Sequence, residues 1–444
     1  MSAIINELSK IFSIKDLRKR IFFTIAIIAI YRLGDFIPTP GVNSAALSQF
    51  VKQSKDSLFG MFDLFVGGAF SQASIFSLGI MPYISSSIII QLLTSIVPFF
   101  EKLKKEGAEG QKKINQYTRY GTLLFAGVQS MGLTTLLQNL HLPDGTPIVP
   151  NPGIAFQLLT ILTMVCGTIF VMWLGEQITE RGIGNGISLL IFIGIVARVP
   201  QDLLETLRLT QTDEINIISL AIFFVFYFLL IASIVFVTQG KRKIKVIYPG
   251  RTRGGYRVSK TEQYIPLSIN IAGVIPIIFA SSLLTFPQTI GMFLGDSEIL
   301  TWINTVFGRG SIVNDLLYFV LIVFFTYFYT AIVFNPEDLA NNIKKNGGYI
   351  PGWKPGKYTA EKIETILHRV TLPGSIFLGL VAVVPYHIYD ALGIKTLTNI
   401  GGGTSILIMI GVALDTVMQL RNHLRMRHYE LEFKQRSQRL GSAF

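Results

Sequence analysis

The stretch that decides the fold is FDLFVGGAFSQASIFSLGIMP, residues 62–82. It is apolar enough to be buried, yet Gly67-Gly68 interrupts it and Asp63 adds a charge. Its first apolar part, about residues 58–70, is far too short to cross a bilayer, which requires about 20 residues. The apolar sequence over 74–100 is long enough. The pattern therefore predicts a short buried helix directly before a membrane span.

The composition of the whole chain predicts an all-α polytopic membrane protein. Half of the 444 residues are apolar and only 15% are charged, whereas a soluble protein of this length needs more charge to cover its surface. The short alternating segments of an outer-membrane barrel are absent from the sequence. Cys166 is the only cysteine, which excludes an intrachain disulfide, and its apolar neighbours predict a small buried residue.

Hydropathy along the chain predicts ten transmembrane helices. The first is a retained anchor, because no small-residue cleavage site follows it. The ten spans cover about residues 21–37, 74–97, 118–138, 154–175, 184–200, 215–238, 266–290, 314–334, 369–391 and 404–420.

The distribution of positive charge predicts the orientation. Beginning with the N-terminus, one set of alternate loops contains 32 of the 39 Lys and Arg residues. By the positive-inside rule these loops and both termini are expected in the cytoplasm. Residues 1–20 predict an amphipathic cytoplasmic helix, and 421–444 a basic cytoplasmic tail.

The same orientation places the short segment before the second span on the outer side of the membrane. Its exposed helix ends would be costly in lipid, so folding back into the protein requires a cavity lined by protein. This is a first indication of a pore. The alternative is a helix that lies on the outer leaflet.

Two long basic loops, 239–265 and 335–369, are expected on the cytoplasmic face. In the first, alternating apolar residues and Gly254-Gly255 predict a two-stranded protrusion. The second has a centre rich in turn residues between two helical patches. The positive charge of such loops can serve only to orient the protein in the membrane and to contact anionic lipid. Their Gly and Pro residues favour ordered surfaces that bind a large acidic partner, such as a ribosome or a motor protein.

No catalytic motif, metal site or cofactor site is expected. Residues 175–186, GEQITERGIGNG, lack the Gly-Lys-Ser/Thr of a phosphate loop, so we interpret them as a tight turn that lets two helices pack closely. The five histidines lack metal-ligand spacing. Energy for any transport must therefore come from a partner or from an ion gradient.

Six sequence runs resemble the SecY family, which forms the central subunit of the bacterial Sec protein-conducting channel. They occur in the order and separation of that family. The runs are FIPTPG (36–41), SIFSLGIMPYISSSIIIQLLT (74–94), EGQKKINQYTRYGT (109–122), MWLGEQITERGIGNGIS (172–188), NIAGVIPIIFASSLL (270–284) and FNPEDLANNIKKNGGYIPG (334–352).

The resemblance implies ten helices in two inverted pseudo-repeat halves that form an hourglass pore. The N-terminal half covers 21–200 and the C-terminal half 215–420, with an external hinge loop at 201–214. The channel is expected to translocate secretory proteins across the membrane and to release membrane proteins sideways into it. The implied location is the plasma (inner) membrane.

The resemblance also implies which residues seal and open the pore. The segment 58–72 matches the plug helix, and its glycines and Ala69 predict close approach with weak packing, so that displacement is easy. We refer to these residues as the plug segment. Its named residues are Phe62, Asp63, Gly67 and Gly68. The implied pore ring is Ile80, Ile84, Ile187, Ile191, Ile278 and Ile408, and the implied lateral gate is Ser85, Gln91, Asn270 and Phe286.

A ring of branched aliphatic side chains can exclude water and ions and still deform around a peptide. Gln91 and Asn270 are costly in lipid unless paired, which predicts a hydrogen bond between them across a closed gate.

The implied partners are the subunits SecE and SecG, with the SecA motor ATPase or the ribosome on the cytoplasmic face. The implied substrates are an unfolded polypeptide and a signal sequence, and the surroundings are membrane lipid. Partner binding is expected at Arg251, Arg253, Arg257, Lys354 and Lys357. Lys354 departs from the family, which usually has Arg there, and it lacks the planar guanidinium fork.

An ion-coupled secondary transporter with inverted repeats is the alternative function. It would need ionisable residues near the middle of the membrane. The candidates Arg32, Asp35, Asp390 and Asp415 all lie near the ends of predicted spans.

Overall fold

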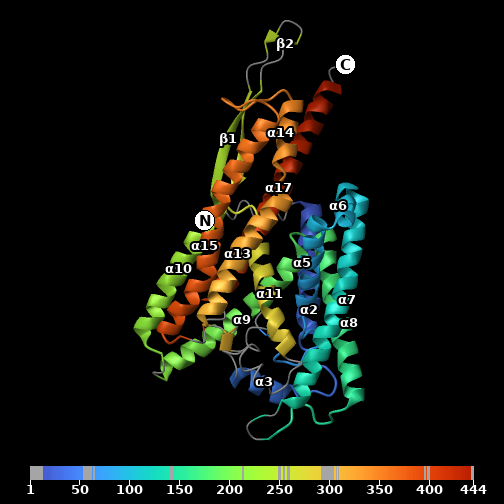
Figure 1. Ribbon diagram of the computed structural model, residues 1–444, viewed down its shortest axis with the longest axis vertical. Coiled ribbons are helices and arrows are strands. Elements are labelled where there is room, and N and C mark those ends of the chain that lie inside the picture. Colours follow the sequence, from blue (N-terminus) through green and yellow to red (C-terminus); the bar gives the residue numbers. More distant parts are fainter. Residues whose placement is uncertain are drawn as a thin grey trace. The chain divides into compact units, whose positions relative to one another are not determined.

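In the part of the chain that it describes, the computed structural model is mainly helical, and its named strands form an extended β-hairpin (Figure 1). It divides into two compact units, Met1–Gln201 with Thr285–Arg309 and Gly411–Phe444, and Asp202–Leu284 with Gly310–Ile410. The structure describes residues 14–53, 63, 66–140, 142, 145–212, 215–248, 252–253, 256–257, 261–291, 305–306, 308, 310–394, 397 and 401–441.

Each of the ten predicted spans corresponds to a helix in the described part of the chain. In chain order they are α2 (Lys15–Gly34), α5 (Met81–Ile96), α7 (Ala108–Asn139), α8 (Ile154–Arg181), α9 (Gly186–Gln211), α10 (Ile217–Gln239), α11 (Ile275–Gly291), α13 (Ile312–Val333), α15 (Lys357–Ala391) and α17 (Gly403–Gly441).

Six of these helices are long and apolar enough by themselves to cross a membrane, namely α8, α9, α10, α13, α15 and α17. A seventh candidate is the pair formed by α5 and α6 (Pro98–Lys105), which meet at a bend of 93°. The other three are shorter or more polar. The length of α11, for example, is 17 residues.

In the first unit, α5, α7 and α8 pack side by side, and α2 packs against α8 (Figure 1). Small residues make the close packing possible. A Cβ on Gly121 of α7 would lie 2.3 Å from the Ser86 hydroxyl of α5, and that hydroxyl donates a 2.7 Å hydrogen bond to the Thr118 carbonyl. A Cβ on Gly167 of α8 would lie 2.1 Å from the Ile75 carbonyl oxygen, so α8 also approaches the chain before α5 closely.

The second span begins later than its hydropathy predicted. Residues 75–80 form turns, and α5 starts at Met81. The reason is local, because Ala73 and Gly79 adopt positive φ, which interrupts a helix, and Pro82 can occupy only its first turn. The Ser74 hydroxyl donates to the Gly34 carbonyl at 3.0 Å, which fixes the turns against the end of α2.

Three other predicted boundaries were wrong. Residues 15–20 belong to α2 rather than to a separate surface helix, and 1–13 lie outside the described residues. The predicted hinge loop 201–214 is helical through Gln211, because α9 tolerates Pro200 and continues in residues with good helix propensity. The seventh span was expected from residue 266, but β4 (Thr261–Ser268) occupies its start.

In the second unit, α13 packs along α15, and α10 also contacts α15. Aromatic side chains fill the space between α10 and α15, where the rings of Phe223 and Tyr389 lie 4.7 Å apart. A hydrogen bond of 2.9 Å joins Tyr318 of α13 to Thr404. The helical framework of this unit carries the β-hairpin described below.

Candidate functional site

The plug segment is described at Asp63 and over 66–72, and Phe62 lies outside the described residues. Residues 66–72 form consecutive turns, so the predicted helix does not extend through them. Gly67 and Gly68 have φ values of 72° and 94°, a left-handed conformation that ends a right-handed helix and that glycine adopts at little cost.

Asp63 anchors the plug segment inside the first unit. Its carboxylate accepts a hydrogen bond from the Ser71 backbone N–H at 2.8 Å and forms an ion pair with Arg198 of α9. The Asp63 backbone carbonyl accepts from the Gly68 N–H at 2.9 Å. The carboxylate is thus satisfied both by its own turn and by a neighbouring helix, as a buried charge requires.

The backbone of the plug segment lies directly against α9. A Cβ added to Gly67 would stand 2.6 Å from the Gly194 Cα, so only glycine permits this approach. Val66, Ala69 and Phe70 are fully buried. The close approach predicted from the glycines is confirmed. The predicted weak packing was wrong, because an ion pair and these buried side chains hold the segment in addition to the glycine contact.

A second arginine reaches the same segment from α2. Arg32 forms an ion pair of 2.6 Å with Asp35, and it also donates to the Gly67 carbonyl at 3.4 Å. Sequence reasoning missed the roles of Arg32 and Arg198 at the plug segment. The available signal was charge, since two arginines within apolar spans and one aspartate within an apolar segment each require a partner.

Five of the six isoleucines of the implied pore ring lie on four helices, and Ile80 is the residue directly before α5. Ile80, Ile84, Ile187 and Ile191 belong to the first unit, and Ile278 and Ile408 to the second. All are buried except Ile187, which is half-buried. The Ile84 N–H donates to the Ile80 carbonyl, so these two occupy one helical turn and share a face, as their spacing predicted. The ring itself stays a prediction.

The polar gate residues make local hydrogen bonds. Gln91 of α5 donates to the Ser87 hydroxyl at 3.2 Å, and Asn270 donates to the Gly273 carbonyl at 3.1 Å. Both amide oxygens are buried and have no partner among the described residues. Ser85 is half-buried on α5, and Phe286 lies in α11. Each amide therefore keeps an acceptor for a further partner, and the bond across the gate stays a prediction.

The glycine turn between α8 and α9 fixes three helices of the first unit together. Gly186 packs against α8, where an added Cβ would lie 1.9 Å from the Gly175 carbonyl oxygen. The Ile183 N–H donates to Thr24 of α2 at 3.1 Å, and the Gly184 N–H donates to Gln419 of α17 at 3.0 Å. The predicted role of this turn in close helix packing is confirmed.

The predicted protrusion is present as a β-hairpin. β1 (Lys241–Tyr248) pairs along its whole length with β4, and β2 (Thr252–Arg253) pairs with β3 (Tyr256–Arg257) at the tip (Figure 1). The pairing of Arg253 with Tyr256 brackets the predicted Gly254-Gly255 turn, which lies outside the described residues. The strands are longer than predicted because β4 runs into the expected seventh span.

The two basic loops form one small domain with its own apolar core. The hairpin packs on α14 (Pro336–Lys345) and the start of α15, and Ile247 and Tyr349 exchange both backbone hydrogen bonds, of 2.9 and 3.0 Å. The centre of the second loop is thereby ordered between two helices, as predicted. The core consists of Ile244, Val246, Leu267, Ile343, Ile350 and Ile363.

Four of the five predicted partner-binding residues belong to the described parts of these two loops. Lys354 and Lys357 are exposed at the turn before α15 and at its first residue. Arg253 and Arg257 belong to the tip strands, and Arg251 lies outside the described residues. Within the hairpin, the 2.7 Å hydrogen bond from Lys245 of β1 to Glu262 of β4 raises the pKa of the lysine above its ordinary value.

The remaining polar chemistry of the described residues is sparse. They contain no group of three His, Cys, Asp or Glu side chains that could hold a metal ion. Cys166 is exposed on α8, so the expectation that it is a small buried residue was wrong. The apolar sequence around it is explained by a lipid-facing helix surface rather than by a protein core.

Comparisons with known proteins identify the family. The family model for SecY matches residues 74–417. The protein translocase subunit SecY of Haemophilus influenzae is 42% identical over 422 residues, which cover 94% of each chain. The protein of the same name from Streptomyces scabiei is 45% identical over 431 residues, covering 95% of this chain and 98% of that one.

Solved structures agree on the fold. A structure described as a protein conducting channel has a TM-score of 0.66 at 17% identity and covers 91% of this chain and 92% of its own. Another, on the plug domain of the SecY protein, has a TM-score of 0.64 at 17% identity with the same coverage. Sec61 in a canine ribosome–channel complex has a TM-score of 0.64 at 16% identity, again with the same coverage.

These matches extend over nearly the whole chain, and the family model covers five of the six runs that suggested the resemblance. Members of this family are channel-forming translocase subunits rather than enzymes. The chain is a multi-pass membrane protein and belongs to the SecY family.

Proposed function

We propose that this chain is the central subunit of a protein-conducting channel, which passes unfolded secretory polypeptides across the membrane and releases membrane segments sideways into lipid. The observation that carries the proposal is the match, over 94% of both chains, to a relative named as a protein translocase subunit. The transporter alternative receives no support from these comparisons, and its candidate acid Asp35 is engaged with Arg32.

In the closed state, two barriers in series seal the proposed pore. The plug segment is one barrier, supported by its burial and by its ion pair with Arg198. The ring of six isoleucines is the other, supported by their apolar side chains and by the shared faces of the pairs on α5 and α9. Displacing the plug segment requires breaking the contacts of Asp63 and of the Gly67 carbonyl.

Lateral release requires the two sides of the gate to separate. Residues 21–200 and 215–420 are the proposed halves that move. The amide oxygens of Gln91 and Asn270, which have no partner among the described residues, support a polar contact that forms when the gate closes. Hydrophobic signal sequences are the proposed ligands of the open gate. A signal-sequence helix can pack against the gate helices in place of the contacts that those helices make with each other in the closed gate.

The proposed orientation places both termini and the β-hairpin domain in the cytoplasm, with the chain in the inner membrane. The excess of Lys and Arg in one set of loops supports this orientation. The proposed partners are SecE, SecG and SecA, and the ribosome. A related channel of the fold has been solved in complex with a ribosome, which supports the ribosome as a partner.

Reconstitution tests the proposed function. The chain, with SecE and SecG, is placed in lipid vesicles with SecA, ATP and a secretory precursor. We expect the precursor to become protected from added protease only when ATP and a signal sequence are present. A preparation that accumulates a small solute along an ion gradient, and leaves the precursor accessible to protease, contradicts the proposal and favours the transporter.

A further inference from the structure

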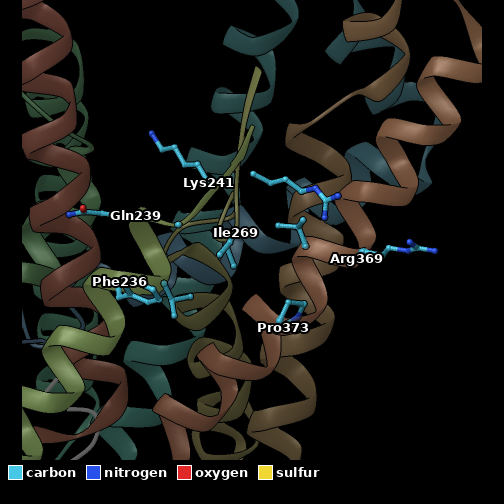
Figure 2. Close-up of a pocket in the computed structure, with 10 residues that line it drawn as sticks. Phe236, Gln239, Lys241, Ile269, Arg369 and Pro373 are labelled. Atoms are coloured by element: carbon cyan, nitrogen blue, oxygen red, sulfur yellow. The ribbon is translucent and has the colours of Figure 1, made fainter. Parts of the chain in front are cut away.

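One cavity of the second unit is explained neither by the pore nor by the hairpin domain. It measures about 680 Å³ and lies where α10 ends, β1 begins and α15 passes (Figure 2). Its volume falls within the range of about 300–1,000 Å³ that is typical of small-molecule sites. Short contacts at Ile269, one of the lining residues, join the elements around the cavity. The Ile269 N–H donates to the Gly240 carbonyl at 2.9 Å, and a Cβ on Gly374 of α15 would lie 2.8 Å from the Ile269 carbonyl.

The charge of the cavity is entirely positive. Lys241, Arg242 and Arg369 line it, and none of its ten lining residues is acidic. All three cations are exposed, and none of them makes an ion pair with a described residue. Figure 2 shows Lys241 and Arg369 extending on different sides of Ile269, so they frame the opening. Three cations without counter-ions around one opening favour an anionic ligand.

Apart from Gln239, the rest of the lining is apolar or glycine. Phe236 and Val237 belong to the last turns of α10, and Val370 and Pro373 to α15. The Phe236 side chain is 81% exposed, although it is large and apolar. The predicted cytoplasmic ends of the sixth and ninth spans, residues 238 and 369, fall at this level. The cavity thus has cations at the predicted membrane surface and apolar side chains just below it.

We propose that this cavity binds the headgroup of an anionic glycerophospholipid, whose phosphodiester lies among Lys241, Arg242 and Arg369 and whose acyl chains lie along Phe236 and Pro373. The amphiphilic lining supports a lipid over a soluble phosphate, because the apolar walls continue beneath the cations. Basic pockets between transmembrane helices at a cytoplasmic surface suit such headgroups. The assignment of the cavity to the cytoplasmic side of the membrane rests on the proposed orientation. The preference for an anionic lipid rests on the lining residues and is independent of that orientation.

The test uses the channel complex in vesicles of phosphatidylcholine that contain a small amount of phosphatidylglycerol with a photoreactive acyl chain. A parallel preparation carries the same group on phosphatidylcholine. After illumination, labelled peptides are identified by mass spectrometry. We expect the phosphatidylglycerol probe to label the peptides that contain Phe236 and Pro373, and the phosphatidylcholine probe to label them weakly. Unlabelled phosphatidylglycerol should compete, whereas soluble glycerol phosphate should not.

Two triple variants sharpen the result. Lys241→Gln, Arg242→Gln and Arg369→Gln together should reduce labelling at least about fivefold, because each cation near a membrane surface contributes to attraction of anionic lipid. The control is Lys344→Gln, Lys345→Gln and Lys362→Gln, which removes the same charge from exposed sites elsewhere on the same unit and should leave labelling unchanged.

The results of these experiments distinguish the possible ligands of the cavity. Equal labelling by both probes, or equal labelling of the two triple variants, overturns the proposal. So does competition by glycerol phosphate, which would indicate a soluble anion site. Labelling of the isolated chain that disappears in the complete complex would instead assign the cavity to a partner subunit. Translocation by the same vesicles is measured separately, so a failed lipid site leaves the proposed channel function intact.

Discussion

Arg198 of α9 forms an ion pair with Asp63 of the plug segment, and the Asp63 side chain is only 1% exposed. These two residues are separated by 135 positions in the chain. The contact therefore ties the proposed plug to a helix that carries two isoleucines of the proposed ring. A charge buried in this way is stable only while its partner is present, which makes Arg198 the most informative position for a first experiment.

Replacing Arg198 with Gln should release the plug segment. It leaves the Asp63 carboxylate buried without its cation, and breaking a buried ion pair at one partner costs about 3–5 kcal/mol. We expect a larger ion leak in planar bilayers than for the unmodified channel, and a smaller leak when Asp63→Asn is added. The control is Arg208→Gln, at an exposed position of the same helix. A leak from Arg198→Gln no larger than that of the control means that the ion pair does not hold the plug segment.

Gly67→Ala should also loosen the plug segment, by contact rather than by charge. The added Cβ would meet the Gly194 Cα at 2.6 Å, and neither backbone can yield easily. Gly107→Ala is a matched control, because Gly107 has nearly the same φ, 73° against 72°, and has nothing within 4 Å of the added atom. We expect a leak from Gly67→Ala and none from Gly107→Ala in single-channel recordings. A leak from Gly67→Ala no larger than that from Gly107→Ala would mean that the close approach to Gly194 does not hold the plug segment.

A disulfide should lock the lateral gate. We expect Ser85→Cys and Phe286→Cys, combined with Cys166→Ala, to form a bridge under mild oxidant and to stop translocation until a reductant is added. A disulfide requires Cα atoms within about 7 Å, so its formation would place the two sides of the gate together. Non-reducing electrophoresis after proteolysis detects the bridge, and each single cysteine serves as a control. No bridge would mean that the gate rests open or that these residues do not face each other.

Reversing the charge of Arg251, Arg253, Arg257, Lys354 and Lys357 should weaken the binding of SecA or the ribosome. Exposed charges are screened over about 8 Å at physiological ionic strength, so the difference between variant and parent should shrink as salt rises. Reversal of Lys102, Lys104, Lys105, Lys112 and Lys113 on the first unit is the comparison set. The test measures the affinity of each variant for SecA or the ribosome across a salt series. Equal losses of affinity for the two sets of lysines and arginines would indicate a general electrostatic effect rather than a binding site on the hairpin domain.

The sequence predicted the ten helices well because hydropathy over a span depends little on packing. It failed where local backbone chemistry overrides hydropathy. The turns before Met81 are set by Ala73 and Gly79, and the seventh span is shortened by strand pairing with β1. Neither effect has a hydropathy signal.

Only part of the candidate site could be predicted from the sequence, for a related reason. The plug segment and its glycines followed from an apolar run that was too short and was interrupted. The Asp63–Arg198 pair did not follow, since contacts between distant positions of one chain leave no local pattern. The isoleucines were found only by family resemblance, because an isoleucine in a span is usually lipid-facing or buried in the core.

The central claim is that the plug segment and the isoleucine ring seal the pore in series. Deleting residues 60–70 should remove one barrier, and changing Ile84, Ile191, Ile278 and Ile408 to Gly should remove the other by widening and wetting the constriction. Each change alone leaves one barrier, so we expect only small or flickering currents.

The decisive measurement is the planar-bilayer conductance of the two variants and of their combination. We expect a large steady current from the combined variant, greater than the sum of the two separate currents. The contradicting result is a deletion that changes nothing and a combined variant that conducts only as much as the ring variant, which would mean that the plug segment takes no part in the seal.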